Sequence, residues 1–74
     1  MSRLIRMDQT GHTMLAEWTA DDSHAIDAAT VAFRAELEHG YYAVSCDGES
    51  HAEHVRELPV DAALVILRRP IAGG

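Results

Sequence analysis

Alternating apolar and polar positions at the start of the chain predict two β-strands. Residues 3–7 (RLIRM) form a short, half-apolar run. Residues 13–18 (TMLAEW) alternate more strictly, which predicts one strand side that carries Met14, Ala16 and Trp18. The turn-forming residues 8–12 (DQTGH) separate the two runs, with Gly11 where a positive φ is expected. We therefore predict an N-terminal β-hairpin.

The next segment has the pattern of an amphipathic helix, which we place at residues 23–39. Asp21, Asp22 and Ser23 supply an N-cap, and Gly40 is a natural residue to follow the last turn. Apolar residues recur at helical spacing and form one stripe: Ile26, Ala29, Thr30, Phe33 and Leu37. We expect this stripe to pack on a sheet, in a core that also contains Trp18, Met7 and Met14.

The second half of the chain predicts three further strands. Residues 41–46 (YYAVSC) have strand composition, and a turn at 47–50 (DGES) leads to a polar strand at 51–58. Residues 63–67 (ALVIL) are apolar without alternation, which suits a strand with neighbours on both sides. Pro70 cannot donate a ladder hydrogen bond and ends the pairing.

The predicted element order is β-β-α-β-β-β, an α+β fold. The last strand is apolar on both faces and therefore belongs in the middle of the sheet, parallel to the first strand. One helix then packs across one face of a mixed sheet, which is the β-grasp arrangement. We predict a single domain at residues 1–69, followed by a flexible C-terminal tail at residues 70–74.

Composition excludes several classes of protein. A 47% hydrophobic content argues against disorder, and a net charge of −6 argues against nucleic-acid binding, which needs clustered Lys and Arg. No signal-peptide pattern and no apolar stretch of membrane-spanning length occur in the sequence, so we expect a cytoplasmic protein with no membrane contact. One cysteine excludes an internal disulfide. We expect a monomer.

The sequence gives no sign of a catalytic or metal site. The five histidines lack the convergent spacing of a zinc site. Cys46 has no neighbouring cationic cluster to lower a thiol pKa, and no two carboxylates stand out as a general acid and base. We therefore predict a protein that is not an enzyme and that uses no metal or cofactor.

Several motifs at matching spacings carry a family resemblance. A Thr10-Gly11-His12-Thr13 turn closes the first hairpin, a long helix follows an acidic cap, and the last strand runs into Arg68-Arg69 and then Gly73-Gly74. In order, spacing and length the chain resembles ubiquitin and its prokaryotic relatives. The bacterial sulfur carriers of thiamine and molybdopterin synthesis share the fold and the Gly-Gly end, and they are equally similar.

The resemblance implies a protein modifier or carrier that an E1-like adenylating enzyme activates at Gly73-Gly74. A sulfur carrier with a C-terminal thiocarboxylate is an alternative within the same class. The absence of lysine fits GC-rich coding, which favours arginine, and it also fits a modifier that cannot join its tail to a copy of itself. The other alternative is a small binding module, regulatory or phage-associated, that uses the open sheet face. The candidate partner-binding residues are Tyr42, Val44, Arg68 and Arg69.

Overall fold

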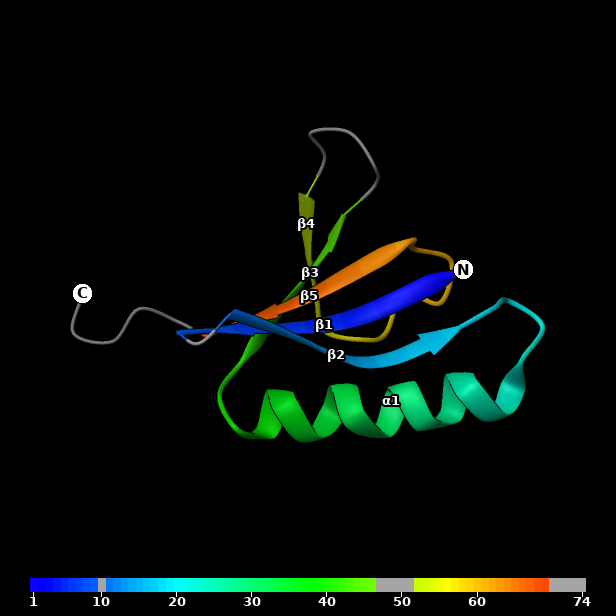
Figure 1. Ribbon diagram of the computed structural model, residues 1–74, viewed down its shortest axis with the longest axis horizontal. Helices are drawn as coiled ribbons and strands as arrows, with labels where there is room; N and C mark the ends of the chain where they lie inside the picture. The colour runs from blue at the N-terminus through cyan, green and yellow to red at the C-terminus, as the bar shows by residue number, and fades with distance from the viewer. Residues whose placement is uncertain (10, 47–51, 70–74) are drawn as a thin grey trace.

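The computed structural model describes residues 1–9, 11–46 and 52–69. In chain order these residues form β1 (Ser2–Asp8), β2 (Gly11–Trp18), α1 (Ser23–Glu38), β3 (Tyr42–Cys46), β4 (Ala52–Val55) and β5 (Leu64–Arg68). The described strands make one mixed sheet in the order β2-β1-β5-β3-β4, and α1 crosses one face of it (Figure 1). The predicted α+β class and element order are confirmed, and the arrangement is compatible with a β-grasp.

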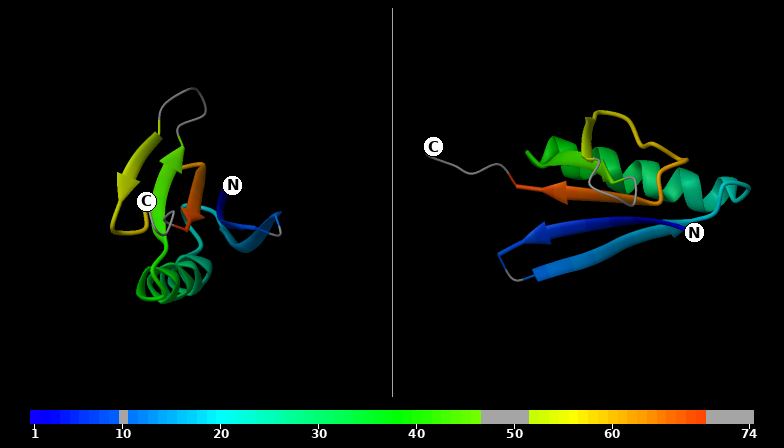
Figure 2. Two further views of the ribbon diagram at one scale, coloured as in Figure 1. Left: turned by 90° about the vertical axis from the view of Figure 1, so that its left-hand side faces the viewer. Right: turned by 90° about the horizontal axis from the view of Figure 1, so that it is seen from above.

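The central position of β5 is also confirmed. β5 pairs in parallel with β1, where Ile5 lies opposite Ile66, and antiparallel with β3, where Val44 lies opposite Ile66. Figure 2 shows the two flanking hairpins on either side of β5, with α1 beneath the sheet. Val65 and Leu67 of β5 are fully buried on the helix side, while Ile66 is half-buried on the opposite face.

The helix begins and ends close to the predicted residues. The Asp22 carboxylate accepts a hydrogen bond from the backbone N–H of Ala25 at 3.1 Å, as an N-cap residue does. At the other end Gly40 has a φ of 96°, and its N–H donates to the carbonyl of Leu37 at 3.0 Å. Since a positive φ costs glycine little, this residue lets the chain leave α1 and turn into β3.

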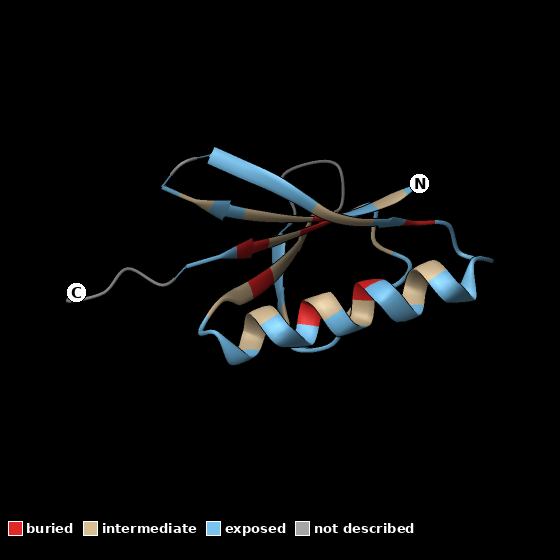
Figure 3. Ribbon diagram, turned by 60° about the horizontal axis from the view of Figure 1, so that its bottom comes forward, coloured by how far each residue is buried: buried red, intermediate tan, exposed pale blue. Residues whose placement is uncertain are grey.

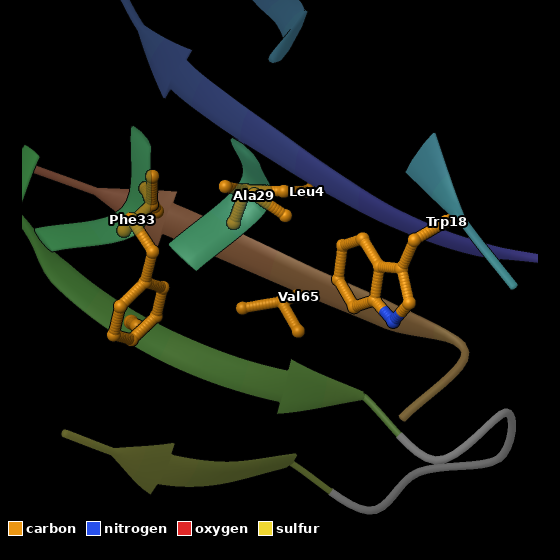
Figure 4. Packing of buried hydrophobic residues seen from close by; sticks show 7 residues of the cluster. Leu4, Trp18, Ala29, Phe33 and Val65 are labelled. Atoms are coloured by element: carbon orange, nitrogen blue, oxygen red, sulfur yellow. The ribbon is translucent and has the colours of Figure 1, made fainter. Parts of the chain in front are cut away.

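A single apolar layer fills the space between α1 and the sheet (Figures 3 and 4). Phe33 and Ala29 are the buried residues of α1; Ile26 and Leu37 of the predicted stripe are half-buried and pack against them. Trp18 closes one end of the layer, and its indole N–H donates to the carbonyl of Val60 at 3.0 Å. The buried residues are Leu4, Trp18, Ala29, Phe33, Ala43, Val65 and Leu67.

Two predictions about β2 and the core are wrong. Met7 and Met14 are not buried, since 40% and 53% of their surfaces are exposed. In addition, Met14 does not share a side with Ala16 and Trp18. The pairing of β1 with β2 shifts by one residue, so that Leu4 faces Ala16 but Ile5 faces Met14. This β-bulge reverses the side of every residue that precedes it in β2.

The fourth strand is shorter than predicted. We expected a strand at 51–58, but β4 ends at Val55, and bends occupy the next two residues. Leu58 and Ala62 of the connection to β5 pack against the core, which takes this segment away from the sheet edge. The predicted turn at 47–50 and the tail at 70–74 lie outside the described residues.

Candidate functional site

The face of the sheet that points away from α1 is the candidate site, and we call it the open face. Strand residues alternate between the two faces, and the core side is fixed by buried Leu4, Val65 and Ala43. The residues between them therefore point away from α1. Because α1 and the connection from β4 to β5 both pack against the core, neither element covers this face in the described part of the chain (Figure 1).

An apolar row crosses the open face from β2 to β3. Strand register places Met14 beside Ile5, Ile5 beside Ile66, and Ile66 beside Val44. Ile5, Ile66 and Val44 are half-buried by their neighbours in the sheet, whereas Met14 is exposed at the edge. Cross-strand neighbours of this kind lie close enough for side-chain contact. The apolar row is thus a continuous surface across four strands.

Aromatic and basic side chains adjoin the apolar row near the carboxyl end of β5. The rings of Tyr42 and His54 stack with centroids 5.2 Å apart and an angle of 3° between their planes. Tyr42 lies opposite Arg68 in the sheet, and Arg68 also lies opposite Met7. We call these four residues the aromatic end of the open face. An aromatic ring beside an arginine is a combination enriched in protein interfaces.

Charge is unevenly divided between the two faces. The acidic side chain that strand alternation places on the open face is Glu17, which Arg3 of β1 pairs at 3.2 Å. On the helix side, Arg6 bridges to Glu36 of α1 at 3.1 Å and approaches Asp8 at 3.9 Å. The chain has a net charge of −6, and yet the described strand residues of its open face are apolar, basic or internally paired. Such a surface suits a protein partner with apolar and acidic groups.

The residues predicted for partner binding fall on or next to this face. Tyr42 and Val44 lie on it, half-buried, and Arg68 lies at its aromatic end. Arg69 is exposed directly after β5. Gly73 and Gly74, predicted for activation, lie outside the described residues.

Leu15 of β2 packs against the core and takes no part in the open face. Sequence reasoning missed Ile5, Ile66, Met7 and Met14 as surface residues. The apolar run at 63–67 already carried the signal for Ile66, because a strand that is apolar on both faces must place some apolar residues opposite the core.

The described residues offer little other chemistry. Within them, His, Cys, Asp and Glu form no group that could hold a metal ion. Cys46 is half-buried on the open face, opposite Leu64 of β5. None of the described helices is long and apolar enough to cross a bilayer.

No protein-family model matches the chain, and the comparisons with curated proteins and with solved structures also gave no match.

Proposed function

We propose that this chain is a ubiquitin-like β-grasp protein that binds another protein through its open face and presents the segment after β5 for covalent activation. The apolar row is the observation that carries the binding part of the proposal. Burying it in an interface would remove Met14 and its neighbours from water. Each Å² of apolar surface removed from water contributes roughly 25 cal/mol of favourable free energy. The sheet order and the parallel pairing of β1 with β5 support the β-grasp assignment.

The activation part of the proposal rests on the position of the segment that follows β5 in the sequence. Arg68 ends this central strand at the aromatic end of the open face, and Gly73-Gly74 follows within six residues in the sequence. An extended chain of that length spans at most about 20 Å. A protein docked on the open face would therefore have the Gly-Gly segment within reach of its own active site. Glycines suit passage through a narrow channel because they have no Cβ.

The chemistry requires Gly74 to carry a free carboxylate. One carboxylate oxygen attacks the α-phosphate of ATP, which releases pyrophosphate and forms an acyl-adenylate. A partner thiolate then displaces AMP and forms a thioester, and an amine of the target displaces that thiolate to form an amide. In a sulfur carrier, hydrosulfide displaces AMP instead and leaves a thiocarboxylate. An E1-like adenylating enzyme is the partner for the first step in both cases.

A binding module without covalent chemistry is the second candidate. The same apolar row favours it, because that surface needs no reactive tail. Deletion of Gly73-Gly74 separates the two candidates. The deletion removes covalent adducts and adenylation from a carrier, but it leaves partner capture by a binding module unchanged.

The test uses the full chain in its native cell, with intact-mass spectrometry of the purified protein and its adducts. Three variants are compared with the parent: the Gly73-Gly74 deletion, Ile66→Arg on the open face, and Val31→Arg on the exposed side of α1 as the matched control. We expect the parent and the control to give adducts or a thiocarboxylate, and the other two to give neither. Adducts that persist after the deletion contradict the carrier proposal. Adducts that persist in Ile66→Arg contradict docking on the open face.

A further inference from the structure

β2 is an unusually open edge of the sheet. It is the longest strand, with eight residues, and among the described residues it pairs with β1 alone. Edge strands commonly carry charges or proline, which discourage pairing with another chain. The segment 11–16 (GHTMLA) contains neither. The opposite edge strand, β4, has four residues and carries Glu53, so it follows the usual pattern.

The exposed methionine of this edge adds a second observation. Met14 is the end of the apolar row and is 53% exposed. The bulge after it turns its side chain to the open face instead of the core. The apolar row ends at the outer edge of β2. A second sheet that paired with this edge would extend the row.

We propose that two copies of this chain pair antiparallel through the first half of β2, which joins their sheets into one. A two-fold axis at Thr13 gives a self-complementary register over Gly11–Leu15, with regular pairing at His12–Met14 and Gly11 opposite the bulged residue Leu15 at each end. Thr13 then lies opposite its own copy, and His12 lies opposite Met14 of the second copy. Within His12–Met14 the directly opposed residues point to matching faces, as an antiparallel ladder requires.

This register has favourable side-chain pairs and no charge clash. A Thr–Thr pair is one of the stabilising cross-strand combinations. The pairing also places the two methionines close together on the open face, so the apolar rows of the two copies become one surface. The nearest fixed charges belong to Arg6 and Asp8 of β1, one strand away from the edge.

The dimer is a weak one. Five paired residues on each side bury less than the roughly 1,200 Å² of a stable specific interface. Each copy also carries a net charge of −6, so long-range repulsion opposes association, and added salt screens it. We therefore expect association in the upper micromolar range that strengthens as the salt concentration rises.

Sedimentation equilibrium of the full chain tests this proposal between about 10 µM and about 1 mM, a range that brackets a weak dimer. The weight-average mass of the parent should rise from 8.1 kDa toward twice that value. Thr13→Lys sets two like charges opposite each other and should weaken association at least about tenfold. Met14→Lys should do the same. Ala52→Lys makes the same charge change on the other edge strand and should leave association unchanged.

Amide hydrogen exchange locates the contact independently of the variants. Backbone amides within 11–15 that point away from β1 should exchange more slowly in concentrated samples than in dilute ones. A parent that stays at 8.1 kDa at about 1 mM overturns the proposal, as does association that Ala52→Lys weakens and Thr13→Lys does not. Protection confined to β4 or α1 also overturns it. Dimerisation does not depend on Gly73-Gly74, so the deletion variant should associate like the parent.

Discussion

Replacing Phe33 with alanine should remove a large part of the stability of this domain. Phe33 is 1% exposed and lies in the apolar layer with Leu4 and Val65 (Figure 4). Loss of a buried phenylalanine typically costs about 3–5 kcal/mol, because the truncated side chain loses its transfer energy and leaves a cavity. A domain of 74 residues has a free energy of unfolding of roughly 4–11 kcal/mol. Phe33→Ala therefore removes from about a quarter to all of it.

Urea denaturation measures this loss directly. Trp18 is the one tryptophan of the sequence and is buried in the same layer, so its fluorescence reports the unfolding of the core. For a domain of this size the slope is about 1 kcal/mol per molar urea, so the midpoint should fall by roughly 3 M or more. Far-UV circular dichroism of α1 should give the same midpoint if unfolding is two-state.

The matched control lies two positions earlier on the same helix. Val31 is 70% exposed, and Val31→Ala removes an apolar side chain that has little contact with the core. Alanine also has the higher helix propensity, so this variant should change stability by less than about 0.5 kcal/mol. If the two variants have equal urea midpoints, the assignment of the buried side of α1 is refuted.

Three further variants test single interactions. Trp18→Phe keeps most of the apolar contact but removes the hydrogen bond to the carbonyl of Val60, so thermal denaturation should show a loss of about 1–2 kcal/mol. Arg6→Met leaves the carboxylate of Glu36 without its partner; we expect a loss of about 1–3 kcal/mol in urea titrations, which a second change of Glu36 to Leu should largely restore. Asp22→Ala removes the N-cap of α1 and should lower the free energy of unfolding by about 1 kcal/mol, measured by urea titration.

The elements that were predicted correctly are those with long or unambiguous patterns. The helix of 16 residues carried an apolar stripe, a cap and a following glycine, so several local signals agreed. The place of β5 followed from its apolar run, because a strand without a polar side needs neighbours and cover. These inferences needed no knowledge of which residues pair across the sheet.

The errors arose where the outcome depends on a partner strand. The bulge opposite Leu4 and Ile5 inserts one extra residue in β2 and thereby reverses the side of Met14. Nothing in the local run TMLAEW marks that insertion, since the alternation itself is undisturbed. The open face could not be predicted from the sequence for the same reason, because its composition depends on which strands pair. Tyr42 and Val44 could be placed together by alternation, but Ile5 and Ile66 join them only once the strand order is known.

Met7 and Met14, the exposed methionines of the sheet, distinguish a candidate binding surface from ordinary sheet packing. Ile5, Ile66 and Val44 need no partner to explain them, because β-branched residues in central strands shield one another laterally and stabilise the sheet. Met14 and Met7 gain little from such shielding, at 53% and 40% exposure. Methionine is also no strong strand former. Its flexible, polarizable side chain adapts to the shape of a partner, and it is used widely on surfaces that bind proteins. The proposed binding to a protein partner would account for the exposure of these two side chains, which sheet stability leaves unexplained.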